Sequence, residues 1–235
     1  ASSAFGRRRH LNEEPVIIAF NHPSWWDPLT CMTVAGLFPE HHHYAPIEAQ
    51  ALEQYPFFKH LGIFAIDSNS PQGLRQLLLA TASIFQGQKN ILWISPQGNF
   101  RDIRQRPPML KPGIGALCAS MQKKGRGSVI PLAMEYMFWT EKKPEIFIAF
   151  GEKIDLANTD KTTAQNWVQI IESAMQKTQD KLAEQVIARD ADAFRPVFSS
   201  NSSTHPVYDI WRRFTFALRG KHYYREHAAT IPRQD

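Results

Sequence analysis

Short apolar runs alternate with segments of helical spacing along most of this chain, and that alternation constrains the fold more than any other feature. Runs of strand type occur at residues 16–20, 42–47, 90–94, 129–134 and 146–150, and helical spacing fills residues 28–38, 49–58, 74–85 and 112–121. Such alternation is typical of α/β folds, in which helices cover the faces of a sheet. We therefore predict an α/β fold with a single mixed sheet flanked by helices.

The last third of the chain adds one long helix and a tail. An amphipathic helix packed on the core is predicted by apolar residues at helical spacing, namely Trp167, Ile170, Ile171, Ala174, Met175 and Leu182. A Ser-rich stretch follows, and residues 208–225 interleave basic and aromatic residues. We expect one domain over residues 1–195, and a linker with a basic-aromatic tail over residues 196–235. A helix in this tail can lie on an anionic membrane or pack back on the domain, and both interpretations stand.

Charge and cysteine content narrow the classes of partner. The formal net charge is +5, which favours polyanions such as anionic lipid headgroups, nucleotide phosphates or nucleic acid. No recognised nucleic-acid-binding motif accompanies the basic residues, so we expect no nucleic acid partner. The two cysteines, Cys31 and Cys118, lie far apart and are expected to be small core residues in a reduced compartment.

No apolar run reaches the ~18 residues that a membrane-spanning helix needs, and the first residues lack the apolar segment of a signal peptide. We expect a cytoplasmic protein, peripheral on the inner face of the membrane. The sequence begins at Ala1 rather than Met, so we leave open an anchor upstream of it.

His22 and Asp27 form the strongest candidate for catalysis. They follow the strand at residues 16–20, at the sheet edge where α/β folds bind ligands, and Pro23 and Pro28 favour a turn or a helix start between them. An imidazole can take a proton from an alcohol at neutral pH, and a carboxylate on its other nitrogen fixes the tautomer. The alternative is structural, with His22 in a turn and Asp27 as a helix N-cap.

Three further segments occur in a fixed order after the pair. They are Gly62-Ile63-Phe64-Ala65-Ile66-Asp67, then Ile94-Ser95-Pro96-Gln97-Gly98-Asn99-Phe100-Arg101, then Val129-Ile130-Pro131-Leu132. With Asn21-His22 and Asp27-Pro28, they resemble the four ordered motifs of the glycerolipid acyltransferase family, whose best known members acylate 1-acylglycerol-3-phosphate. The resemblance spans about residues 15–155.

The resemblance implies an enzyme that moves a fatty acyl group from acyl-CoA or acyl carrier protein to a hydroxyl of a lipid acceptor. His22 and Asp27 would be catalytic, and no metal or cofactor beyond the acyl donor is implied. Backbone N–H groups near residues 96–98, or in the turn after His22, would stabilise the oxyanion. Substrate contacts are expected from Asn21, Asp67, Ser68, Pro96, Gln97, Gly98, Arg101, Arg104 and Lys111.

Two departures from the family pattern concern the acceptor. Ser68 stands where the family usually has an Arg, and in the third motif, typically Phe-Pro-Glu-Gly-Thr-Arg, Gln97 and Phe100 replace the Glu and the Arg. These family positions are associated with gripping a phosphate. The departures predict an acceptor with a bulkier or less charged head than 1-acylglycerol-3-phosphate, and they raise the alternative of a catalytically silent module that binds a lipid surface.

The run His41-His42-His43 is a candidate metal site, because imidazoles bind zinc and nickel. Adjacent side chains of a strand point to opposite faces, so three consecutive rings cannot converge on one ion without an irregular backbone. We therefore expect no metal, with one ring packed inward and two on the surface.

Overall fold

A mixed sheet forms the centre of the molecule. The computed structural model describes residues 13–67, 70–139 and 143–197. In this part of the chain seven strands form the sheet, in the order β3-β2-β4-β1-β5-β6, with β7 beside β5. The first five are parallel and the last two antiparallel to β5, and their bounds are β1 (Val16–Phe20), β2 (His42–Glu48), β3 (Ile63–Ile66), β4 (Asn90–Ile94), β5 (Ser128–Met137), β6 (Glu145–Phe150) and β7 (Ile154–Asp155).

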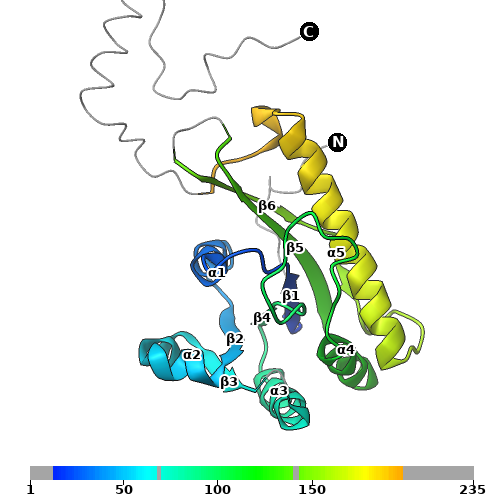
Figure 1. The fold of residues 1–235 in the computed structure, drawn as a ribbon. Coiled ribbons are helices and arrows are strands. Elements are labelled where there is room, and N and C mark those ends of the chain that lie inside the picture. Colours follow the sequence, from blue (N-terminus) through cyan, green and yellow to red (C-terminus); the bar gives the residue numbers. More distant parts are fainter. Residues whose placement is uncertain (1–12, 68–69, 140–142, 198–235) are drawn as a thin grey trace, which may run out of the picture.

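The helices divide between the two faces of the sheet (Figure 1). On one face α3 (Pro71–Ile84), α4 (Gly113–Lys123) and α5 (Ala164–Ile187) pack on the strands, and Trp167 is fully buried there. On the other face α1 (Asp27–Ala35) contributes Cys31 and Val34 to a second core. Alternate residues of the central strands β1, β4 and β5 supply the two cores, as expected for a sheet buried on both faces. The α/β fold predicted from the sequence is confirmed.

Two predicted helices differ from the observed elements. The helix expected at residues 28–38 ends at Ala35, just before Gly36. The helix expected at residues 49–58 is two elements, α2 (Ala49–Gln54) and the 3-10 helix η1 (Pro56–Leu61), because Pro56 has no N–H to continue the hydrogen bonds of an α-helix. A second short 3-10 helix, η2 (Ala191–Ala193), follows α5.

The long amphipathic helix is confirmed as α5. Thr163 caps its first turn by accepting a hydrogen bond from the Asn166 N–H, and one stripe is buried: Trp167, Ile171, Met175, Thr178, Gln179, Leu182 and Val186. In the described ranges, every helix is too short or too polar to cross a bilayer. The predicted tail falls almost entirely on residues 198–235, which lie outside the described residues, and the domain boundary at residue 195 stays a prediction.

Candidate active site

The candidate site lies where the central strand β1 ends and α1 begins. Val16–Phe20 is wholly apolar and is paired on both sides, by β4 and by β5. The chain turns over residues 21–26, and Pro28 occupies the first turn of α1, where its missing N–H costs no hydrogen bond. This turn holds His22 and Asp27 at the carboxyl edge of the parallel strands, as the sequence predicts.

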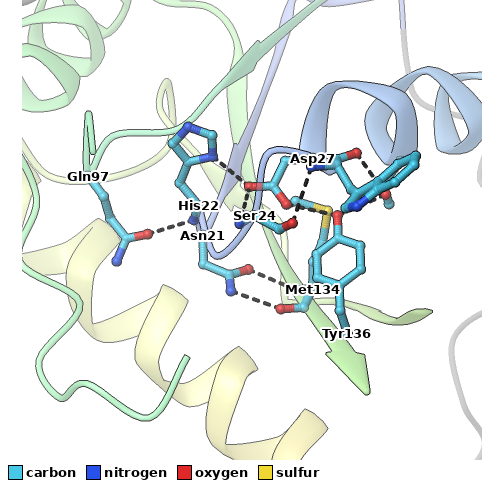
Figure 2. Close-up of polar contacts among 9 residues, drawn as sticks. Asn21, His22, Ser24, Asp27, Gln97, Met134 and Tyr136 are labelled. Carbon is cyan, nitrogen blue, oxygen red and sulfur yellow. Dashed lines mark hydrogen bonds and ion pairs between the residues drawn. The ribbon is translucent and has the colours of Figure 1, made fainter. Parts of the chain in front are cut away.

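His22 and Asp27 are in direct contact. The imidazole Nδ1 lies 2.5 Å from Asp27 Oδ2, and the Asp27 side chain is 0% exposed, whereas that of His22 is 25% exposed (Figure 2). Oδ2 also accepts the Ser24 N–H at 3.2 Å. A carboxylate on Nδ1 leaves Nε2 as the nitrogen that can accept a proton, which is the arrangement of a general base with its orienting acid. Asp27 is therefore not an N-cap, because its oxygens face the turn and β5.

Tyr136 also contacts Asp27, and no sequence pattern pointed to this residue. Its hydroxyl donates to Asp27 Oδ1 at 2.8 Å and lies 2.8 Å from the Thr30 hydroxyl (Figure 2). Burial raises the pKa of Tyr136 well above its usual range, and the nearby Asp27 carboxylate raises it further. The phenol thus keeps its proton and donates to Asp27 at neutral pH, with Thr30 able to donate to the phenol in turn.

Asn21 fixes the turn to β5 instead of facing the solvent. Its Nδ2 donates to Met134 O at 2.9 Å, its Oδ1 accepts the Met134 N–H at 2.7 Å, and the residue is 2% exposed (Figure 2). Both polar ends of the side chain are thereby used by one residue of the neighbouring strand. The prediction that Asn21 contacts substrate gains no support, and the geometry favours a role in positioning His22.

Gln97 is a second internal link. Its Oε1 accepts the His22 N–H at 2.7 Å, and its Nε2 donates to Pro108 O at 2.8 Å, while the residue is 3% exposed. The amide therefore joins the turn of the candidate base to the loop that precedes α4. A glutamate here could accept from His22 but could not donate to Pro108, so a glutamine can make both contacts inside the fold.

Lys111 lies across the turn that follows β4. Its N–H donates to Pro96 O at 2.8 Å, and its Cε would lie 2.5 Å from a Cβ placed on Gly98, which has a φ of +66°. Gly98 is thus needed both for the left-handed conformation and for the room that the lysine side chain occupies. Gly98 was predicted to contact substrate, whereas in the structure the Lys111 side chain lies against it.

Residues 99–111 carry the predicted cations, and the structure separates them. Arg104 forms two hydrogen bonds with the Asp102 carboxylate of its own loop, and Arg106 Nε donates to Asp180 of α5 at 2.6 Å. Arg101 is the one joined to the site, since its N–H donates to His22 O at 2.9 Å and its Nε is a buried atom without a hydrogen-bond partner. The aromatic ring of Phe100 lies over the imidazole, with 4.5 Å between the ring centroids.

Asp67 lies apart from this cluster. It follows β3, and β2 and β4 stand between that edge strand and β1, which corresponds to roughly 14 Å at the usual spacing of strands. It shares the carboxyl edge with His22 but does not adjoin it. The neighbouring candidate, Ser68, lies outside the described residues.

Several backbone donors expected to stabilise an oxyanion are already used. The N–H of Gly98 donates to Ser95 O at 3.2 Å, that of His22 to Gln97, and that of Ser24 to Asp27. These three N–H groups therefore form hydrogen bonds within the protein and do not point to a bound oxyanion.

The histidine run does not converge on a point. His43 Nε2 contacts Phe38 O at 3.2 Å, and its Nδ1 accepts from Trp93 Nε1 at 3.1 Å, so both nitrogens of this ring have partners. His42 is exposed, whereas the ring nitrogens of His41 are also buried, which corrects the expectation of two rings on the surface. Among the described residues, no group of three or more His, Cys, Asp or Glu side chains is placed to hold a metal ion.

A comparison with known families identifies the family of the chain. The family model described as Acyltransferase matches residues 4–135, which is more than half of the chain. The chain belongs to the acyltransferase family. The matched range contains the His22–Asp27 turn and the β4 loop, and it ends one residue before Tyr136. Family membership implies acyl transfer from an acyl donor to a lipid acceptor, and no curated protein matches the chain.

Proposed function

We propose that this protein is a glycerolipid-type O-acyltransferase that moves a fatty acyl group from acyl-CoA or acyl carrier protein to a hydroxyl of a lipid acceptor. The observation that carries the proposal is the 2.5 Å contact between His22 Nδ1 and the buried Asp27 carboxylate. The intact pair also argues against a catalytically silent lipid-binding module. We propose no metal and no cofactor beyond the acyl donor.

The reaction needs one base and no covalent acyl-enzyme. His22 Nε2 takes the proton of the acceptor hydroxyl while that oxygen attacks the thioester carbonyl, and Asp27 stabilises the imidazolium. The carbon–sulfur bond then breaks, and the imidazolium returns the proton to the departing thiolate. The products are the acyl ester and the free thiol, so atoms and charge balance.

The pairing of the cations near His22 indicates how much charge the head of the acceptor carries. Arg104 is paired with Asp102 and Arg106 with Asp180, and Gln97 is used inside the fold. Beside the turn after β4, Arg101 is the cation placed for an acceptor head, since its Nε is buried without a hydrogen-bond partner and its N–H donates to His22 O. We therefore propose an acceptor that is less charged than 1-acylglycerol-3-phosphate, with Arg101 as its main polar contact.

Product analysis tests the reaction. Purified protein is incubated with acyl-CoA and a mixed lipid extract, and mass spectrometry identifies the lipid that gains an acyl chain. An acylated lipid that depends on the protein supports the proposal. Free fatty acid without an acylated lipid would point to a hydrolase instead.

Kinetics on two acceptors test the specificity. The rates with 1-acylglycerol-3-phosphate and with a neutral lipid alcohol are compared for the wild type and for Arg101→Ala. We expect the neutral alcohol to be preferred, and a clear preference for the phosphorylated acceptor, lost in Arg101→Ala, would contradict this. A loss in Arg101→Ala that is equal for both acceptors would instead assign Arg101 to the oxyanion, since the N–H groups of His22, Ser24 and Gly98 are already used.

A further inference from the structure

The outer face of the α1 region exposes an unusual number of large apolar side chains. Trp25 and Trp26 are 60% and 57% exposed, and Leu29 and Met32 are 42% and 43% exposed. These four residues, called the α1 surface here, lie on the turn that carries His22 and on the helix that follows it. Contiguous exposed apolar groups of this kind mark surfaces that contact a partner or a membrane.

The α1 surface lacks charge and extends onto the sheet. In Asp27–Ala35 the only ionisable carboxylate is Asp27, which is buried, and the helix carries no basic residue. Tyr136 contacts Asp27 and pairs with Ile146 across β5 and β6, so Ile146 lies on the same face of the sheet as α1, and it is 49% exposed. The described helices other than α1 that pack on the central strands cover the opposite face.

The composition of the surface fits a lipid interface. Tryptophan is enriched where membranes meet water, because its ring is apolar and its N–H remains hydrated. The loop of residues 99–111 brings cations near this turn, since the Arg101 backbone N–H donates to His22 O and the Arg104 side chain, which pairs with Asp102, is 85% exposed. A second copy of the chain could also cover an apolar surface. Such a dimer contact would leave these cations without a role.

We infer that the α1 surface is a membrane-docking surface, which rests in a lipid bilayer containing anionic headgroups and presents His22 to acceptors within it. The inference rests on the proposed function for the use of His22, and it assigns membrane contact to the turn and α1 instead of the tail. An acceptor hydroxyl at headgroup depth would then reach the imidazole without leaving the bilayer.

Quenching by brominated lipid tests which tryptophans enter the bilayer. Of the six tryptophans, Trp93, Trp139 and Trp167 are buried and Trp211 lies outside the described residues. With vesicles of brominated phosphatidylcholine and phosphatidylglycerol, we expect the quenching of the full chain to be lost in the Trp25→Phe/Trp26→Phe variant and kept in Trp211→Phe. Phenylalanine keeps the surface apolar, so vesicle binding itself should persist. Quenching that is unchanged in the double variant, or lost only in Trp211→Phe, would overturn the inference.

Vesicle flotation gives the second test. Trp25→Glu/Trp26→Glu should weaken binding by roughly tenfold or more, because burying a large apolar side chain shifts an equilibrium by that factor. The matched control is Leu79→Glu, since Leu79 is 61% exposed on α3, and its binding should match the wild type. Equal binding by the wild type and the double glutamate variant would overturn the inference. A dimer of the wild type that is lost only in the double glutamate variant would overturn it as well. His22→Ala should float like the wild type, so a failure of docking and a failure of the catalytic proposal give different results.

Discussion

Asp27 is a fully buried carboxylate that is surrounded by hydrogen-bond donors. Its two oxygens receive three donors, from His22 Nδ1, the Ser24 N–H and the Tyr136 hydroxyl. A buried charge of this kind is costly unless it is hydrogen-bonded, and removal of one donor leaves part of that cost uncompensated. Tyr136 is therefore a positioning residue for the catalytic pair that we propose.

Tyr136→Phe should lower the rate of transfer more than the affinity for substrate. Without the hydroxyl, Asp27 loses one of its three donors and orients the imidazole less firmly, so kcat should fall while KM stays close to that of the wild type. The rate at neutral pH should fall by roughly tenfold, as expected for one charged hydrogen bond. The matched control is Tyr44→Phe, since Tyr44 packs against the core on the opposite face of the sheet. An unchanged kcat in the folded variant would show that Tyr136 serves the fold alone.

Gln97→Glu should lower activity. The glutamate cannot donate to Pro108 O, which Gln97 Nε2 contacts at 2.8 Å inside the protein, and a carboxylate there would face a carbonyl oxygen. We expect a loss of about 1–3 kcal/mol in the free energy of unfolding, and a lower kcat/KM. Urea titration and a steady-state assay measure both, with the exposed Gln88→Glu as control. Higher activity in Gln97→Glu would mean that the carboxylate is used on substrate.

The sequence could predict the contact between His22 and Asp27 because they lie five residues apart in one turn. It could not identify Tyr136, which reaches Asp27 only because β5 pairs with β1, across 109 positions of sequence. Asn21 and Gln97 were predicted to contact substrate because they flank the motifs. Whether a polar side chain beside a motif faces the ligand or the fold depends on neighbouring strands and loops, which are distant in sequence.

At the scale of elements, α4 and α5 approach closely at a glycine. A Cβ on Gly115 would lie 2.0 Å from Ala164 O and 2.7 Å from Val168 Cγ2, so the first turn of α5 sits on the backbone of α4. This contact places α5 against the loop of residues 99–111, which α5 holds through Asp180 to Arg106 and Glu172 to the Leu110 N–H. The packing of α4 on α5 thereby supports the loop that contacts His22.

Gly115→Ala should therefore destabilise the protein by about 1–3 kcal/mol, because a carbonyl oxygen of the neighbouring helix cannot move aside cheaply. Gly113→Ala is the matched control in the same helix, since its Cβ would meet only side-chain atoms at 3.7 Å or more. That variant should be neutral or slightly stabilising, as alanine favours helix over glycine. Urea unfolding of both variants decides the matter, and equal stability of Gly115→Ala and the wild type would contradict the observed approach of the helices.

Element types could be predicted from the sequence better than element ends. Short apolar runs predicted β1 over Val16–Phe20 and β4 over Asn90–Ile94 where they are observed, whereas β5 runs from Ser128 to Met137, beyond the predicted residues 129–134. The prediction of one helix over residues 49–58 is wrong, because Pro56 has no N–H to continue an α-helix and a 3-10 helix begins there. The order of the strands follows from pairings between segments far apart in sequence, which no local pattern encodes.

At the scale of the whole molecule, the two sheet faces each bury one cysteine. Burial raises the pKa of Cys118 to about 12, and it raises the pKa of Cys31 still more, with the Asp27 charge adding to the effect. Both thiols are thus protonated at pH 8 and shielded by the two cores, as predicted for small core residues.

Thiol labelling should report this burial directly. At pH 8 the native protein should react negligibly with a thiol reagent. The denatured chain should react with two equivalents of the reagent, one for each cysteine. The rate of labelling then follows unfolding and serves as a check on the folding of every variant above. Rapid labelling of the native protein would contradict the packing of α1 or α4 on the sheet.

The proposed function depends on one proton transfer at His22, and the rate of thiol release from acyl-CoA in the presence of acceptor measures it. A positioned base supplies about 10²–10⁴-fold, so His22→Ala should lose transfer by that factor while its thiols stay protected from labelling. Asp27→Asn should also be severe, because the amide favours the wrong imidazole tautomer. Thiol release by folded His22→Ala at a rate near that of the wild type would contradict the His22 mechanism.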